Sequence, residues 1–132
     1  MIERLDHLVL TVADIETTCR FYADALGMEV VRFGDGRTAL RFGMQKINLH
    51  QAGAELEPRA AHAIPGSADL CFVTRQSLRS VCARLRAASV TVAEGPVERT
   101  GALGPFLSLY CRDPDDNLVE ISRYPDEGTV PG

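Results

Sequence analysis

The sequence predicts an α+β fold in which one domain, residues 1–126, contains two βαβββ modules. The order strand, helix and three strands can be read twice along the 132 residues. The residues repeat as well: D-H-L-V-L-T-V aligns with A-D-L-C-F-V-T, which sets His7 against Asp69, and K-I-N-L-H aligns with L-V-E-I-S, which sets Asn48 against Glu120. Internal duplication of this kind is typical of two units that close around a shared space, here a curved mixed sheet with a concave cleft.

The first module covers residues 1–52. Residues 5–12 alternate and predict a strand, and Asp14 is a suitable N-cap for a helix with apolar residues at helical spacing that ends at Gly27. Short alternating runs separated by glycine-containing turns predict three further strands, at residues 29–33, 38–42 and 46–50.

A polar connection, residues 53–66, leads to the second module, residues 67–126, and a tail follows at residues 127–132. The connection contains two prolines and has no periodicity. The second module repeats the order of the first, with a strand at 68–74, a helix at 78–88 and strands at 91–93, 106–111 and 118–122. A D-P-D-D-N turn separates the last two strands.

Composition favours a cytoplasmic protein that binds a small molecule. The net charge of −4 and the pI near 5.3 argue against nucleic-acid and anionic-membrane partners, which require clustered Lys and Arg. No apolar run reaches the roughly 20 residues of a membrane span, and the amino terminus has no secretion signal. The four cysteines are scattered without a C-x-x-C pair, so we expect buried free thiols rather than disulfides or a thiolate metal site.

Polar residues interrupt the apolar strands at matching positions. Side chains alternate across a strand, so His7, Asp69 and Glu120 should share the concave side, away from the helices. A carboxylate within L-V-E-I is expensive to desolvate unless it is paired, hydrogen-bonded, metal-bound or open to a cavity. Taken singly, Glu120 also fits a surface glutamate and His7 a structural histidine, so the prediction of a site depends on their convergence.

Two imidazoles and a carboxylate suit a divalent transition metal. If the modules form one curved sheet, then His7, His50 and Glu120 can meet and leave coordination positions open for a bidentate oxygen ligand. This mixture of nitrogen and oxygen donors does not predict whether the metal is Zn, Ni, Mn, Fe or Co. Asp69 could be a fourth ligand, an orienting residue or a general base.

The motifs resemble the vicinal oxygen chelate superfamily, which includes glyoxalase I, fosfomycin- and bleomycin-resistance proteins and extradiol dioxygenases. The resemblance extends from about residue 2 to 124 and rests on D-H-L-V-L-T-V, D-I-x-x-x-x-x-F-Y, L-G-M-E-V and D-P-D-x-N-L-V-E-I. L-R-F-G-x-Q-K-I-N-L-H and P-G-S-A-D-L-C-F further resemble the glyoxalase domain-containing protein 5 subgroup. The resemblance implies a homodimer with one divalent metal ion per site.

The same resemblance assigns His7 and Glu120 as metal ligands. It places Asp69 at a ligand position where many relatives have a histidine, and Asn48 at one where glyoxalase I has a carboxylate or an amide. Asn48 is a poor ligand for a transition metal, so His50 could replace it or contact the substrate instead. Asp116 stands where relatives usually carry glycine.

The substrate class implied is a small oxygen-rich metabolite whose two neighbouring oxygens chelate the metal. Glu120 or Asp69 would act as the catalytic base. Arg99 and Thr100, expected on the loop before the seventh strand, and Arg41 could bind an anionic part of the substrate.

Two functions follow. The favoured one is a metal-dependent lyase or isomerase of the glyoxalase type; the alternative is a metal-free protein that sequesters a drug or metabolite, as bleomycin-resistance proteins do. A ring-cleaving dioxygenase fits less well, because the chain is short and the usual second histidine is missing.

Overall fold

A computed structural model describes residues 1–125, 127–128 and 130–131. Residue 126, the expected end of the domain, and residues 129 and 132 of the expected tail lie outside the described residues. The chain divides into two compact units, residues 1–68 and residues 69–132, here called unit 1 and unit 2. Each unit is described by itself.

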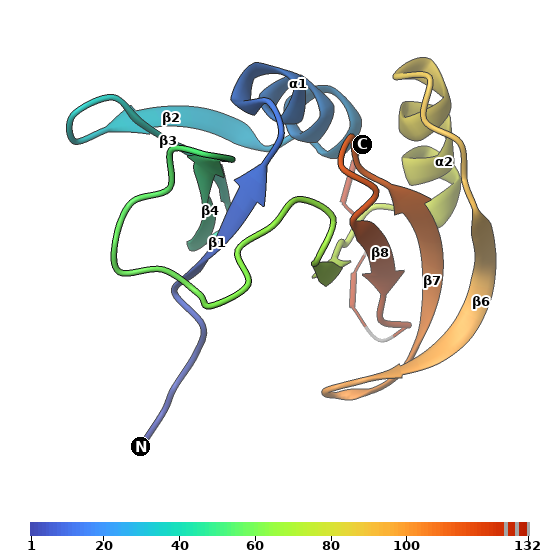
Figure 1. The fold of residues 1–132 in the computed structure, drawn as a ribbon. Helices are drawn as coiled ribbons and strands as arrows, with labels where there is room; N and C mark the ends of the chain where they lie inside the picture. Colours follow the sequence, from blue (N-terminus) through green and yellow to red (C-terminus); the bar gives the residue numbers. More distant parts are fainter. Residues whose placement is uncertain (126, 129, 132) are drawn as a thin grey trace. The chain divides into compact units, whose positions relative to one another are not determined.

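Unit 1 contains one helix and a four-stranded sheet (Figure 1). The strands lie in the order β1-β4-β3-β2, with β1 parallel to β4 and the other neighbours antiparallel. The elements are β1 (His7–Val12), α1 (Ile15–Leu26), β2 (Glu29–Phe33), β3 (Arg37–Phe42) and β4 (Gln45–Gln51).

The ends of α1 are those that the sequence predicts. Asp14 is the N-cap, and its Oδ2 accepts a hydrogen bond from the backbone N–H of Thr17 at 2.9 Å. Gly27 ends the helix with φ of 70°, a left-handed conformation that glycine adopts without strain. Cys19, Tyr22 and other apolar residues of α1 are buried, so the helix covers one face of the sheet and leaves the other for the polar side chains.

Unit 2 repeats this topology (Figure 1). Its sheet has the order β5-β8-β7-β6, with β5 parallel to β8. The elements are β5 (Asp69–Val73), α2 (Leu78–Ala87), β6 (Glu94–Gly101), β7 (Gly104–Arg112) and β8 (Leu118–Arg123). The predicted α+β fold of two βαβββ modules is confirmed, and the strands form two four-stranded sheets, one in each unit.

The register of the strands shows that the sequence repeat is also a structural repeat. His7 opens β1 and Asp69 opens β5. Asn48 pairs with the third residue of β1, and Glu120 pairs with Cys71, the third residue of β5. Asn48 and Glu120 therefore occupy the same place in their respective sheets.

The sixth strand differs from its prediction. Residues 91–93 are not in a strand, and β6 instead runs from Glu94 to Gly101, across Gly95 and Pro96. A register shift between Glu94 and Val97 accommodates the proline, and β6 is an edge strand, where a missing backbone N–H is tolerated. A Gly-Pro pair disfavours a regular strand, but an edge strand can bulge around it.

The turn before β8 is held by a buried hydrogen-bonded pair. Oδ1 of Asp113 accepts from the backbone N–H groups of Asp115 and Asn117, both at 2.9 Å, and Oδ2 accepts from Nδ2 of Asn117 at 2.8 Å. Asp116 has φ of 64°, so it occupies the conformation that a glycine would take, as aspartate tolerates. This turn fixes where β8 starts and thereby the position of Glu120.

Neither described helix is long and apolar enough to cross a lipid bilayer. All four cysteines are free. Cys19 and Cys111 are buried and Cys82 is half-buried, but Cys71 is exposed, so the expectation of a buried thiol is wrong there. Cys71 lies on the edge strand β5 and faces away from α2, which explains its exposure.

Candidate functional site

In unit 1, His7 and Asn48 lie on the sheet face opposite α1. His7 pairs with Lys46 across the β1–β4 ladder. Asn48 is two residues beyond Lys46 on β4, so its side chain lies on the same sheet face as His7 and diagonal to it. The ring of His7 is exposed, and its Nδ1 lies 2.8 Å from Oδ1 of Asp6. This hydrogen bond holds the pKa of Asp6 below its ordinary value of 3.8. An Nδ1–H donated to a carboxylate leaves the Nε2 lone pair of His7 available, which is the usual state of a metal-binding histidine.

His50 is far from His7 along the sheet. It pairs with Thr11, four positions beyond the pairing of His7 with Lys46, a separation of about 13 Å along the strands. Side chains on one face of a sheet point in similar directions, so this separation argues against one ion bound by both histidines. The register thus favours the second expectation for His50, a contact other than the metal.

Two buried side chains of β4 have polar atoms that lack a hydrogen-bond partner among the described residues. Asn48 is 4% exposed and His50 is 7% exposed. Oδ1 of Asn48 and both ring nitrogens of His50 have no partner among the described residues. Buried polar atoms are rarely left unsatisfied, so these atoms are suited to a ligand or an ordered water.

Arg41 pairs with Lys46, which pairs with His7, so it lies on the same sheet face. Its guanidinium donates to Oε2 of Glu29 at 2.7 Å on the exposed surface of unit 1. Arg37 and Lys46 both lie over the ring of Phe33, at 4.7 and 3.9 Å from its centroid.

In unit 2, Glu120 and Asp69 share the sheet face opposite α2. Glu120 pairs with Cys71 across the β5–β8 ladder, so Asp69 lies one diagonal step away, as Asn48 does from His7. Asp69 is exposed and Glu120 is half-buried. Each unit thus offers two oxygen or nitrogen donors at equivalent places.

A chain of hydroxyl groups holds the Glu120 carboxylate. The Oγ of Ser108 donates to Oε2 of Glu120 at 2.6 Å, and Oγ of Ser122 lies 2.7 Å from Ser108 and 3.2 Å from the same carboxylate oxygen. The thiol of Cys71 lies 3.3 Å from Ser122. Both serines are fully buried, so the orientation of Glu120 is fixed from within the sheet.

Glu120 lines a cavity of about 420 Å³ in unit 2, here called the Glu120 cavity. Its walls include Cys71 and Val73 from β5, and an aromatic side formed by Phe106, Tyr110 and Tyr124. The volume is in the range of pockets that bind small organic molecules. Partial desolvation of the sulfur raises the pKa of the Cys71 thiol, and Glu120 and Asp69 add to this, so Cys71 is not an activated nucleophile.

Arg99 and Thr100 line the same cavity from β6. The sequence places them on a loop, whereas they belong to the strand. The guanidinium of Arg99 lies 5.6 Å from the centroid of the Tyr110 ring and 3.3 Å from a carboxylate oxygen of Glu94. The interaction with Tyr110 raises the pKa of Arg99, and the interaction with Glu94 adds a smaller increase. Burial raises the pKa of Tyr110.

Sequence reasoning missed Ser108, Tyr110 and Tyr124. The signal for the first two was present, because the antiparallel β7–β8 hairpin pairs Tyr110 with Glu120 and Ser108 with Ser122. Strand alternation within F-L-S-L-Y-C, applied from Glu120, would have identified both. Tyr124 follows β8, and its hydroxyl accepts a hydrogen bond from the backbone N–H of Leu103 at 3.0 Å in the β6–β7 turn. No sequence pattern predicts that contact.

Among the residues that the structure describes, no three or more His, Cys, Asp or Glu side chains form a group that could hold a metal ion. The four expected donor positions are divided between the units, with His7 and Asn48 in unit 1 and Asp69 and Glu120 in unit 2.

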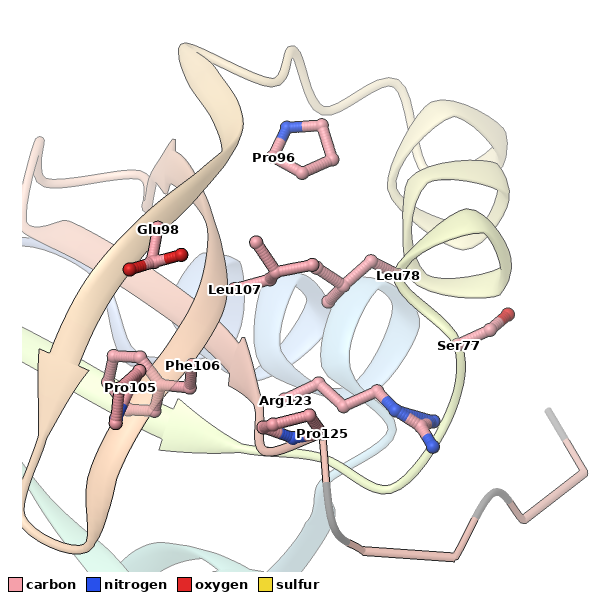
Figure 2. Close-up of a pocket in the computed structure, with 9 residues that line it drawn as sticks. All are labelled: Ser77, Leu78, Pro96, Glu98, Pro105, Phe106, Leu107, Arg123 and Pro125. Carbon is pink, nitrogen blue, oxygen red and sulfur yellow. The ribbon is translucent and has the colours of Figure 1, made fainter.

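A second cavity in unit 2, of about 480 Å³, lies on the other side of the sheet, beside the start of α2 (Figure 2). Leu78 from α2 and Leu107 from β7 extend toward one another in it, and Pro96, Pro105 and Pro125 complete an apolar lining. Its charged lining residues are Glu98 and Arg123, and neither is one of the expected metal donors.

The fold agrees with comparisons to known proteins. The sequence model of the Glyoxalase/Bleomycin resistance protein/Dioxygenase superfamily matches residues 4–121, so the chain belongs to this family. It is 56% identical over 124 residues to a virulence protein of Salmonella typhimurium (strain LT2), covering 94% of this chain and 86% of that protein. It is 55% identical over 125 residues to a glyoxalase domain-containing protein of Mycosarcoma maydis, covering 95% and 70%.

Solved structures support the same assignment. The crystal structure of the Salmonella typhimurium virulence protein has a TM-score of 0.92 to this chain, with 94% of this chain and 98% of that chain covered. Structures at 20–24% identity share the fold: a lactoylglutathione lyase from Agrobacterium tumefaciens, an antibiotic-binding protein from Streptomyces, and a fosfomycin resistance protein from Listeria monocytogenes, with TM-scores of 0.70, 0.72 and 0.64. The last of these was crystallised with Mn(II) and a dihydroxypropylphosphonic acid.

Proposed function

We propose that this protein is a metal-dependent enzyme of the glyoxalase type, a lyase or isomerase that acts on a small oxygen-rich metabolite. The observation that carries the proposal is the matched register of the two units. Duplicated strands place His7 and Asn48 on one sheet and Asp69 and Glu120 on the other, at equivalent positions. Together the two pairs supply four donors, a number that suits one divalent metal ion.

The side chains fit a divalent metal. His7 offers Nε2 because Asp6 engages its Nδ1, and Glu120 offers a carboxylate oriented by Ser108. Asp69 is an exposed carboxylate, and Oδ1 of Asn48 is a buried oxygen without a partner. Nitrogen from imidazole with oxygen from carboxylates suits Mn, Fe, Co, Ni or Zn. We assign His7 and Glu120 as ligands, Asn48 as a weak further ligand and Asp69 as either a ligand or the general base, and leave His50 outside the set.

A divalent ion bound there would stabilise negative charge on two neighbouring substrate oxygens. Asp69 is the better candidate for a general base, because it is exposed and no hydrogen bond fixes its carboxylate to a neighbouring side chain among the described contacts. Glu120 is held by buried serines and is better suited to a fixed position. Arg99 and Thr100 would bind the part of the substrate that does not react.

Metal analysis of protein purified without chelator tests the proposal. The chain has three histidines, which allow a matched set of variants. We expect about one divalent ion per chain in the parent protein, in His62→Ala and in His50→Ala, and loss of metal in His7→Ala and Glu120→Gln. His62 is exposed in the connection between the units and serves as the control. Equal metal content in all four variants, or substoichiometric metal in the parent, would contradict the proposal.

A second candidate is a metal-free protein that sequesters a drug or metabolite. The observation that favours it is the aromatic side of the Glu120 cavity, with Phe106, Tyr110 and Tyr124 available to contact a planar ligand. Ligand binding that persists unchanged after chelator treatment, together with no metal in the purified protein, would favour this candidate.

Three narrower statements belong to the same proposal. We propose that the chain belongs near the glyoxalase domain-containing protein 5 subgroup, which its motifs resemble. A homodimer is the assembly that we expect. A reducing cytoplasm is the compartment that we expect, and it suits four free cysteines.

A further inference from the structure

We propose that the Glu120 cavity selects an organic acid with an apolar body, whose carboxylate binds Arg99 and which carries a second oxygen toward Glu120. The inference deepens the proposed function by naming a substrate class for the same site. It depends on the proposed function only for the role of the second oxygen.

The cavity has two chemically different ends. Glu120 lies at one end on β8, and Arg99 lies at the other on β6, with Tyr110 on the intervening strand β7. Tyr110 is paired with Glu120 across the ladder and lies under the guanidinium of Arg99. A ligand that contacts both ends therefore needs an anionic group for Arg99 and must pass along the Tyr110 ring.

The aromatic side selects the body of the ligand. Phe106 and Tyr124 pack with ring centroids 5.0 Å apart, and both line the cavity with Tyr110 and Val73. Apolar or aromatic groups gain from contact with such a surface, whereas a small, fully hydrated acid such as lactate would leave most of it exposed to water. The cavity volume of about 420 Å³ accommodates a ligand with a phenyl-sized body.

Glu94 would compete with an anionic ligand for the guanidinium of Arg99. Its guanidinium lies 3.3 Å from Glu94, and the two side chains are 43% and 57% exposed. A ligand carboxylate must displace or share this contact. Removal of Glu94 should therefore strengthen the binding of an anion, and removal of Arg99 should weaken it. These opposite effects are specific to recognition of a negative charge at this place.

The tyrosine between Arg99 and Glu120 has no counterpart at the equivalent position of unit 1. Ala39 pairs with Asn48 as Tyr110 pairs with Glu120, so the two sheets share a strand order and differ in the side chain at this place. This difference supports unit 2 as the part that selects the substrate.

Calorimetric titration of the full chain with mandelate and with the neutral mandelamide tests the inference. The two probes share the phenyl group and the hydroxyl, and differ in charge. We expect mandelate to bind more tightly. Arg99→Gln should weaken mandelate about two- to five-fold and leave mandelamide unchanged, the range for an exposed ion pair, and Glu94→Gln should tighten mandelate by a similar factor.

Two control variants lie close by. Glu98 is on the same strand as Glu94 and Arg99 but lines the cavity on the other side of the sheet, so Glu98→Gln should change neither probe. Arg86→Gln removes an arginine from α2 and should also have no effect. Equal binding of the two probes, no binding of mandelate at millimolar concentration, or weaker binding in Glu94→Gln would overturn the inference.

Repeating the titrations after chelator treatment separates this inference from the proposed function. Opposite effects of Arg99→Gln and Glu94→Gln in protein that never contains metal would support the acid-binding cavity and contradict the metal enzyme. Stoichiometric metal that depends on His7 and Glu120, combined with no effect of Arg99→Gln, would support the enzyme and contradict the acid-binding cavity.

Discussion

Replacement of Ser108 by alanine removes the hydroxyl that holds Glu120. Ser108 is fully buried and donates to Oε2 of Glu120 at 2.6 Å, and it also contacts Ser122 at 2.7 Å. The second serine lies 3.2 Å from the same carboxylate oxygen and can replace only part of the lost interaction. The variant therefore leaves Glu120 on the sheet without its main donor.

The magnitude follows from the chemistry of the bond. A hydrogen bond to a charged group contributes about 1.5–3 kcal/mol, and the half-buried Glu120 can recover some of this from water. We expect the free energy of unfolding to fall by about 1.5 kcal/mol, at the low end of that range. For a chain of this size the loss corresponds to a decrease in Tm of roughly 5 °C.

Chemical denaturation of four proteins measures the effect: the parent, Ser108→Ala, Glu120→Gln and the double variant. Because a neutral acceptor gains less from a hydroxyl than a carboxylate does, Ser108→Ala should cost less in the Glu120→Gln background. Ser67→Ala, which removes an exposed hydroxyl bonded to the backbone oxygen of Ile64, is the control. Equal costs in the two backgrounds would refute the coupling between Ser108 and the Glu120 charge.

Three other predictions concern the surroundings of the site and the helix. A Cβ on Gly101 would overlap the hydroxyl of Tyr124 and the Phe106 ring, so Gly101→Ala should destabilise the protein by about 1–3 kcal/mol in urea unfolding and abolish mandelate binding; unchanged stability would contradict this contact. Asp14→Ala should lower Tm at pH 7, and because the pKa of Asp14 is below 3.8 in the folded state, the deficit should disappear as pH falls through the folded pKa; a deficit that persists at pH 2 would contradict the capping role. With a thiol reagent at pH 8, Cys71 should react first but slowly, and Cys111, whose pKa burial raises to about 11, should react only on unfolding, which peptide mapping can follow.

The fold could be predicted because short-range sequence patterns define each strand and helix of the two modules. Alternating apolar residues predict the strands, and Asp14 and Gly27 predict the ends of α1. The sequence repeat then predicts that the second module has the same order of elements as the first. The strand at 91–93 was wrong because Gly95 and Pro96 favour a break, and only the tertiary context of an edge strand with a bulge overrides that preference.

The candidate site could be predicted only in part. Alternation places His7, Asn48, Asp69 and Glu120 on the faces opposite the helices, as the registers have it. The distance between His50 and His7 depends on the register in which β1 pairs with β4. The alternation of residues along one strand does not predict that register. Likewise, the serines and aromatic residues around Glu120 come from hairpin pairing and from a contact between distant turns. Periodicity assigns a side chain to a face, whereas its partners depend on which strand lies beside it.

Titration of chelator-treated protein with Mn(II), followed through the electron paramagnetic resonance signal of the free ion, tests the central claim most directly. The metal-enzyme account predicts saturable binding of about one ion per chain in the parent and in His62→Ala. It predicts that His7→Ala and Glu120→Gln lose this binding, although they lie in different units. Binding that survives both substitutions, or no binding in the parent, would contradict a metal site that uses both His7 and Glu120.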